Sequence, residues 1–292
     1  MLLEIAKKIH DDIFTKMSES SFTIFLIGAA QKDRFSIRET LRKELTRFRY
    51  LHDFNFYYPE ELFAELILSK AKFDLLSLEN MLAESVHAVV IILESPGAIA
   101  ELGAFANHPN LRNKLVVIVD KKYRKARSFI RLGPVRYLEK KTNSKVIFHD
   151  LAEPNFGKLA FETRKAVKDI SRNSVVEASI KNPISAQFFI MTCIFIMEQI
   201  SIELLNNIIH YVYTLQTPEV EAIVQSSLNI LLKQKDISLN NGNYDLTDNG
   251  YRRIMFKLGS QGRETYDLID ELRVKIMNVK LRRRTFSREG VH

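Results

Sequence analysis

Residues 88–103 read AVVIILESPGAIAELG, and this stretch decides the fold of the first half of the chain. Its first six residues form an unbroken apolar run rich in Val and Ile, which is typical of a strand covered on both faces. Pro96 and Gly97 then make a tight turn, and the residues after them suit a helix. The stretch therefore predicts a buried strand that leads directly into a helix.

The same alternation of strand and helix extends outward from this stretch, over residues 22 to about 170. A helix is predicted after Ser36, because Glu39 three residues later completes a capping box. Because parallel strands need crossover connections, the alternation predicts an α/β fold with a parallel doubly wound sheet. Further strands are expected at 22–27, 54–58, 114–119 and 145–148, and further helices near 60–69, 77–85 and 158–170.

The pattern changes after about residue 173, where apolar strands stop and helical periodicity takes over. Thr217 and Pro218 suit the N-cap and first position of a helix, and Asn241-Gly242 between two short strands predicts a hairpin. With a closing helix from Tyr251, this order predicts a mostly helical winged helix-turn-helix domain. Its helices are expected at 185–200, 201–212 and 217–235. We expect three parts: residues 1–172, residues 180–260, and a basic helical tail, 261–292.

Composition excludes several classes of protein. The 292 residues are 46% hydrophobic and 27% charged, as in a globular protein and unlike a disordered chain. Cys193 is the single cysteine, which excludes an internal disulfide and a Cys-rich zinc site, and the seven His lack metal-ligand spacing. The longest apolar run, residues 188–197, is too short to span a bilayer. We therefore expect a cytoplasmic protein without a metal and without a membrane segment.

The formal net charge of +8 is concentrated in two basic clusters. Nine Lys or Arg and one Glu lie within residues 121–141, and seven Lys or Arg without an acid lie within 273–288. Such clusters indicate a polyanion partner, usually nucleic acid, although a solvated face and a frayed basic tail give the same pattern. The contact residues that we predict are Lys121, Lys122, Arg124, Arg127, Arg282, Arg283 and Arg284.

The candidate site follows from the rule that ligands bind beyond the carboxyl ends of parallel strands. Ser95 can cap the helix that opens at Pro96, and Glu101 lies about one turn into it. A positioned, ionised carboxylate there can attack or stabilise a sugar anomeric carbon. Glu94 and Glu60 follow two neighbouring strands, so either can hydrogen-bond a leaving base or act as a general acid. For Glu101, the alternative is a helix start with a solvent-facing glutamate. For Glu94 and Glu60, it is an ordinary acidic residue near a helix start, and for Glu60 this alternative weighs equally.

The remaining predicted site residues surround this edge of the sheet. The substrate-binding residues that we predict are Gly28, Ala29, Tyr58, Ser95, Gly97 and Asn107. Gly28-Ala29-Ala30 is not a GxGxxG sequence and no Walker A sequence is present, so common dinucleotide and phosphate-loop motifs are absent.

Two motifs resemble a known family. Glu-Ser-Pro-Gly-x-x-x-Glu-Leu-Gly at 94–103, preceded by Tyr-Pro-Glu at 58–60, resembles the nucleoside deoxyribosyltransferase-like family. Residues 76–105, 127–136 and 276–286 resemble more closely the effector proteins of bacterial retrons, which are encoded beside a reverse transcriptase and its branched RNA–DNA product. The resemblance covers most of the chain, including the predicted winged helix.

The resemblance implies a toxic N-glycosidase that acts on a nucleotide after phage attack, with NAD+ hydrolysis as the expected reaction. NAD+ is then a substrate, and no cofactor is expected. Glu101 takes the nucleophile's place, whereas Glu94 stands one residue further from it than the family's base-contacting Asp. Residues 28–31 lack the family's aromatic side chain. The implied partners are the reverse transcriptase and its multicopy single-stranded DNA (msDNA), in a homo-oligomer or higher assembly.

Two other functions fit the sequence less well. A non-enzymatic regulator could sense a nucleotide through the sheet domain and bind DNA through the winged helix. It has no need of an ionised Glu101 at the end of a strand. A phosphoribohydrolase of the lonely-guy type uses a related strand–Gly–Glu arrangement, but its Pro-Gly-Gly-x-Gly-Thr run is absent after Pro96.

Overall fold

A computed structural model describes residues 1–19, 21–29, 36–47, 53–58, 85–172, 180, 183–259 and 261–289, without the side chains of residues 19, 21, 53, 183 and 283–289. The chain divides into two compact units. One comprises Ser21–Glu177, and the other comprises Met1–Ser20 together with Ala178–His292. The predicted helices near 60–69 and 77–85 lie outside the described residues.

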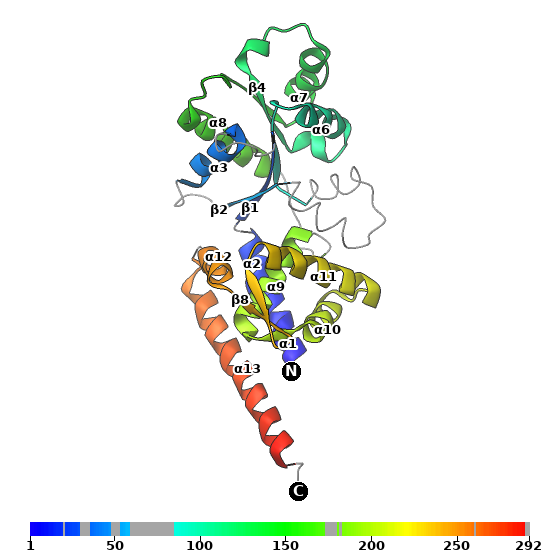
Figure 1. The fold of residues 1–292 in the computed structure, drawn as a ribbon, viewed down its shortest axis with the longest axis vertical. Coiled ribbons are helices and arrows are strands. Elements are labelled where there is room, and N and C mark those ends of the chain that lie inside the picture. The colour runs from blue at the N-terminus through cyan, green and yellow to red at the C-terminus, as the bar shows by residue number, and fades with distance from the viewer. Residues whose placement is uncertain are drawn as a thin grey trace. The chain divides into compact units, whose positions relative to one another are not determined.

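The Ser21–Glu177 unit contains a five-stranded parallel sheet in the order β2-β1-β3-β4-β5, which confirms the predicted fold class (Figure 1). The central strands are apolar throughout, and every residue of β3 and β4 is buried, because helices cover both faces of the sheet. The five strands are β1 (Ser21–Ile27), β2 (Asp53–Tyr57), β3 (Ala88–Ile92), β4 (Leu115–Asp120) and β5 (Lys145–His149).

Helices lie on both sides of this sheet. Figure 1 shows α3 (Ile37–Arg47) and α8 (Phe156–Ser171) on one side, with α6 (Pro96–Asn107) and α7 (Arg136–Lys141) on the other. Between β4 and α7 the chain forms two short helical segments, η3 (Lys121–Tyr123) and η4 (Arg131–Val135), and a further one, η2 (Leu111–Asn113), precedes β4. The core on the α3 and α8 side includes Leu41, Val90 and Ile118, all fully buried.

The start of α3 realises half of the predicted capping box. The Ser36 hydroxyl accepts a hydrogen bond from the Glu39 N–H at 3.1 Å, as an N-cap does. The Glu39 carboxylate instead accepts hydrogen bonds from Arg42 and Tyr58. In a full capping box, the Glu39 carboxylate would accept a hydrogen bond from the Ser36 N–H. Here it is bound by Arg42 and Tyr58 instead.

The second unit is built around α9 (Pro183–Met197), whose described side chains are almost all buried. Cys193 lies in this helix and is fully buried, as expected of a core residue. Around α9 lie α10 (Ile202–Tyr213), α11 (Thr217–Lys233) and α12 (Asp248–Leu258), followed by the long α13 (Arg263–Glu289). None of the described helices is long and apolar enough to cross a membrane.

A small antiparallel sheet completes the winged-helix order in this unit. Its strands run β6-β8-β7, with bounds β6 (Ile200–Ser201), β7 (Ile237–Asn240) and β8 (Asn243–Leu246). Asn241 and Gly242 join β7 to β8 with φ values of 49° and 78°, the left-handed conformation that a two-residue hairpin requires. The predicted hairpin and its turn are therefore confirmed.

Two predicted helix starts shift in the structure. Gln216 is the N-cap of α11 and makes no side-chain cap bond, so Thr217 is the first helical residue and Pro218 the second. Helix α12 begins at Asp248, three residues before the predicted start, because the Thr247 hydroxyl accepts a hydrogen bond from the Gly250 N–H at 3.2 Å.

The N-terminal residues belong to the second unit, although the sequence prediction placed them with the sheet domain. Helices α1 (Leu2–Lys8), η1 (Ile9–Phe14) and α2 (Thr15–Glu19) precede β1. Helix α1 packs against α10 and α13, and η1 packs against α9. Ile9, Ile13 and Phe14 are at most 1% exposed, so these helices form part of that unit's core.

Candidate active site

The candidate site lies at the carboxyl ends of β1 and β3. The strand order places these two strands side by side, with the chain leaving them toward opposite ends of the sheet. A crevice opens at such a switch point, and ligands of parallel α/β proteins bind there. Gly28 follows β1 and Glu94 follows β3, so the topology brings these two predicted residues together.

Glu94 is fastened to the turn after β1. The Ala29 N–H donates a hydrogen bond to Glu94 Oε1 at 3.0 Å, and a Cβ on Gly28 would approach the same oxygen to 2.8 Å. Gly28 therefore makes room for the carboxylate. Burial raises the pKa of Glu94 above its usual range, although the Ala29 hydrogen bond and nearby Arg38 act in the opposite direction. Glu94 is thus poised to hold a proton more readily than an ordinary glutamate.

Helix α6 begins as predicted, with Ser95 as its N-cap. The Ser95 hydroxyl accepts a hydrogen bond from the Ala98 N–H at 3.2 Å, and Gly97 is exposed in the first turn. Glu101 is partly buried in the second turn, beyond the reach of most of the helix-dipole effect. Asn107 is exposed at the opposite end of the helix, about 18 Å of helical rise from Ser95, so the structure does not bring it to the site.

Tyr58 takes part in a cluster with α3. Its hydroxyl donates to Glu39 at 2.5 Å, and the Arg38 guanidinium lies 4.5 Å from the centre of its ring. Burial and the hydrogen bond to Glu39 raise the pKa of Tyr58. The Arg42 side chain holds the pKa of Glu39 down at about 2, against the effect of burial. The hydroxyl and the ring of Tyr58 are therefore both in contact with protein groups. Glu60, the other residue predicted near the end of β2, lies outside the described residues.

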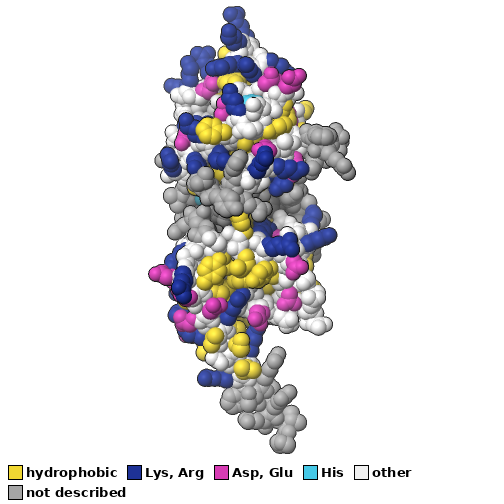
Figure 2. Space-filling view, turned by 90° about the vertical axis from the view of Figure 1, so that its left-hand side faces the viewer, with side chains coloured by type: hydrophobic (Ala, Val, Ile, Leu, Met, Phe, Trp, Pro, Cys, Tyr) yellow, Lys and Arg dark blue, Asp and Glu magenta, His cyan; other side chains and the backbone are white. Residues whose placement is uncertain are grey.

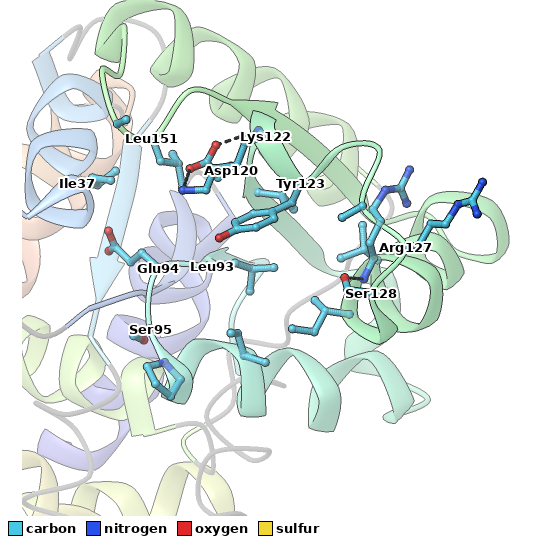
Figure 3. A pocket seen from close by; sticks show the side chains of 18 residues that line it. Ile37, Leu93, Glu94, Ser95, Asp120, Lys122, Tyr123, Arg127, Ser128 and Leu151 are labelled. Carbon is cyan, nitrogen blue, oxygen red and sulfur yellow. Dashed lines mark hydrogen bonds and ion pairs between the residues drawn. The ribbon is translucent and has the colours of Figure 1, made fainter.

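A cavity of about 870 Å³ opens beside this cluster (Figure 3). Glu94, Ser95 and Ile37 line the end nearest the switch point, and Pro96 and Ile99 contribute the first turn of α6. Glu101, one turn further along α6, is not among the residues that line the cavity. Its inner wall is apolar, with Leu93, Val119, Ile130, Val135 and Leu151. Among the described residues, no group of three or more His, Cys, Asp or Glu side chains could hold a metal ion.

Only part of the first basic cluster, residues 121–141, lines this cavity. Lys122 and Arg127 line it, whereas the exposed Lys121 and Arg124 do not. The Lys122 ammonium pairs with Asp120 at 2.9 Å, and the Arg124 guanidinium lies 5.6 Å from the Phe148 ring. Figure 2 shows Lys and Arg side chains spread over the visible face of this unit, more frequent than Asp and Glu.

The second basic cluster is partly structural. Arg273 and Lys280 of α13 donate hydrogen bonds to the carbonyl oxygens of Phe195 and Met197, at 3.0 and 2.7 Å. These two carbonyls belong to the last turn of α9, where helices favour cations. Arg282 is exposed on the same helix, and the side chains of Arg283 and Arg284 lie outside the described part of the chain.

Two residues at the site were missed by sequence reasoning. Arg38 is 4% exposed and lies beside Glu94 and Tyr58, and Tyr123 lines the cavity just after β4. The rule that parallel strands share a carboxyl edge could have found Tyr123, because it follows a predicted strand by four residues. For Arg38 the sequence offers only a charge on the inward face of a predicted helix.

The fold and this site can be set beside known proteins. A family described as STM3845 retron effector protein matches residues 34–239. An Escherichia coli protein named "Retron Ec86 putative ribosyltransferase/DNA-binding protein" is 32% identical over 286 residues, which cover 93% of this chain and 89% of that protein. The similarly named Escherichia coli protein of retron Ec73 is 34% identical over 117 residues, covering 39% of this chain and 36% of that one. The match along most of its length shows that the chain belongs to the STM3845 retron effector protein family and is a retron effector.

Proposed function

We propose that this retron effector is an N-glycosidase that cleaves the N-glycosidic bond of a nucleotide, with NAD+ hydrolysed to nicotinamide and ADP-ribose. The observation that carries the proposal is the cavity at the switch point, which has the Glu94 carboxylate and the first turn of α6 in its wall. Glu101 lies in the next turn of α6, outside the lining, and its role as the nucleophile is part of the proposal. The word ribosyltransferase in the names of both relatives supports a reaction at a ribose anomeric carbon.

In the proposed reaction, the Glu101 carboxylate attacks the anomeric carbon while the bond from that carbon to nitrogen breaks. Nicotinamide leaves as a neutral base with the electron pair of that bond. Water then attacks the same carbon of the glycosyl ester, which releases ADP-ribose and a proton and regenerates the carboxylate. Glu94, whose pKa burial raises, hydrogen-bonds the leaving base, or protonates a base that cannot leave neutral.

Membership of a retron effector family supports a role for the proposed activity within a retron system. We propose that the reverse transcriptase and its msDNA restrain the effector until phage attack, and that loss of NAD+ then halts the infected cell. Co-expression provides the test at this level. The chain alone should lower cellular NAD+ and stop growth, whereas the chain with its reverse transcriptase and msDNA should leave both normal.

The chemistry is tested with the purified full-length chain and NAD+. Glu101→Gln preserves size but removes the charge, so nicotinamide release should fall by on the order of 10³-fold or more. Glu162→Gln is the matched control and should retain activity, because α8, the helix of Glu162, contributes no residue to the cavity lining, whereas α6, the helix of Glu101, does. Circular dichroism of each variant reports whether it is folded. A folded Glu101→Gln chain that still releases nicotinamide at the wild-type rate removes Glu101 from the mechanism.

A DNA-binding regulator is the second candidate, favoured by the winged-helix order and by the DNA-binding wording in the relatives' names. The exposed surface of α11 argues against reading of duplex DNA. It presents Glu219 and Glu221, and its Gln225 side chain donates to Asn229 at 3.0 Å. We propose that this domain docks onto the reverse transcriptase and its msDNA. Selection of random duplexes with the full chain should yield no enriched motif; a motif lost in Gln225→Ala supports the regulator.

A further inference from the structure

Residues 121–135, which follow β4, form one wall of the cavity. The proposed mechanism assigns no role to this wall. Tyr123 and Arg127 both belong to this segment and both line the cavity. Figure 3 shows the Tyr123 ring pointing across the cavity toward Glu94, and Arg127 at the opposite end. The cavity therefore has a carboxylate at one end, an aromatic ring within it and, at the opposite rim, an arginine whose side chain extends outward.

Tyr123 is half exposed although it faces an apolar wall. Its exposed fraction is 50%, and that of Ile99 on the same cavity is 39%. Large apolar side chains that remain exposed in a concave site gain burial when a planar ligand enters, and an aromatic ring favours stacking with a heteroaromatic base. This part of the cavity suits the base next to the reacting bond.

The charges on the wall single out Arg127. Two other cations that line the cavity are paired, Lys122 with Asp120 at 2.9 Å and Arg131 with Glu139 at 2.7 Å. Arg127 is exposed and makes no hydrogen bond or ion pair within the described residues. A guanidinium in this position offers two parallel N–H donors, the geometry that a phosphate group accepts.

The volume of the cavity agrees with a ligand larger than a nucleoside. At about 870 Å³, it lies near the upper end of the range of small-molecule sites, about 300–1,000 Å³. A nucleoside whose anomeric carbon lies at the Glu94 end would leave the Arg127 end of the cavity without contacts.

We propose that Tyr123 and Arg127 determine the substrate class: Tyr123 stacks on the base at the reacting bond, and Arg127 binds a phosphate group of the same substrate. The enzyme then selects nucleotides over nucleosides. This inference rests on the proposed glycosidase function, and it transfers Arg127 from the predicted nucleic-acid contacts to the substrate site.

The test compares NAD+ with nicotinamide riboside, which carries the same reacting bond and leaving base but no phosphate. In the full-length chain, Arg127→Gln should lower kcat/KM for NAD+ by about 10- to 100-fold, chiefly through KM, because a charge-assisted hydrogen bond is lost. The value for nicotinamide riboside should stay within about twofold of wild type. Tyr123→Leu should lower kcat/KM for both substrates, and Tyr123→Phe should restore both. Arg136→Gln, at an exposed arginine that directly follows this segment and lies outside the cavity lining, is the control.

Equal loss on both substrates in Arg127→Gln, or no loss on either, overturns the role of Arg127. Unchanged kinetics in Tyr123→Leu overturn the role of Tyr123. Calorimetric titration with NAD+ and with nicotinamide riboside separates this inference from the proposed function. If the wild-type chain releases no nicotinamide but Arg127→Gln selectively weakens NAD+ binding, the glycosidase proposal fails and the phosphate site stands. If binding shows no selective loss, the phosphate site fails whatever the turnover.

Discussion

Glu39 shows how tertiary contacts change the chemistry of one side chain. Its carboxylate accepts two hydrogen bonds from Arg42, at 2.6 and 2.9 Å, and one from Tyr58. These charge-assisted bonds favour the ionised form, and they lower the pKa of Glu39 from 4.5 to about 2. The cluster ties the end of β2 to α3, next to the turn that holds Glu94.

This cluster predicts a pH dependence of stability. Since the pKa of Glu39 is depressed in the folded chain, its contribution is fully present above about pH 4.5 and is lost as the pH falls toward 2. Urea unfolding followed by circular dichroism should show this loss in wild type and a smaller loss in Glu39→Gln. Glu44→Gln on the same helix, where Glu44 pairs with Arg47 at 3.4 Å, should retain the wild-type profile. Parallel profiles for wild type and Glu39→Gln would contradict the assignment.

Gly250 is a second position where one atom decides stability. A Cβ there would overlap the carbonyl oxygen of Asp236, which already accepts hydrogen bonds from the N–H and hydroxyl of Thr247. Gly250→Ala should therefore lower the free energy of unfolding by about 1–3 kcal/mol. The clash is with the backbone of Asp236, which cannot move aside as the end of a flexible side chain can.

Gly103 in α6 is the matched comparison, because a Cβ there meets no atom within 4 Å. Gly103→Ala should stabilise the chain by about 0.5–1 kcal/mol through helix propensity. Urea unfolding of both variants checks the opposite signs, and a neutral or stabilising Gly250→Ala would show that the turn at Asp236 can move.

At the scale of elements, side chains of α13 cap the C-terminal end of α9. Lys280 lies in a run that reads as a nucleic-acid tail, yet its ammonium donates to the Met197 carbonyl at 2.7 Å, while Arg282 is exposed. One basic cluster therefore contains two kinds of cation, one that holds a helix end and one that faces solvent.

Substitution of one cation of each kind should distinguish the structural role from the DNA-binding role. Lys280→Ala should lower the free energy of unfolding by about 1–3 kcal/mol, because a carbonyl loses a charged donor. Arg282→Ala should change stability by less than about 0.5 kcal/mol. It should instead flatten the salt dependence of single-stranded DNA binding by roughly 0.7 log unit. Urea unfolding and binding titrations at several salt concentrations are the measurements. A stable Lys280→Ala, or an Arg282→Ala slope equal to wild type, would reject the corresponding role.

At the scale of the whole molecule, the chain enters one unit, builds the other, and returns to complete the first. The N-terminal helices supply Ile9, Ile13 and Phe14 to the core around α9, and the His10 ring packs edge-on against Phe189 at 5.5 Å. A fragment that begins at residue 178 lacks these side chains. Each large apolar side chain that loses its cover costs about 1.5–3 kcal/mol of burial.

Fragments test this division. Residues 21–177 should unfold cooperatively by themselves, whereas residues 178–292 should do so only when residues 1–20 are joined to them through a flexible linker. Thermal unfolding followed by circular dichroism is the measurement. Equal melting of residues 178–292 with and without the added helices would assign residues 1–20 a role outside that core.

Sequence by itself determined the elements whose signals are local. The apolar run of β3, the Ser95 cap of α6 and the Asn241-Gly242 turn need only neighbouring residues to form, and the structure contains each of them. The parallel sheet followed because strands with intervening helices can pair in few ways. Placement of Glu94 at a sheet edge needed no more than the end of its strand.

Only the tertiary structure decided which side chains share a site and which are taken up by packing. Lys122, Arg127, Lys280 and Arg282 look alike in the sequence, but two line a cavity, one caps α9 and one faces solvent. The N-terminal helices pack in the unit formed by the C-terminal part of the chain, and their apolar pattern does not specify that choice. Hydrophobic contact is not directional, so periodicity predicts that a face is buried without saying against what.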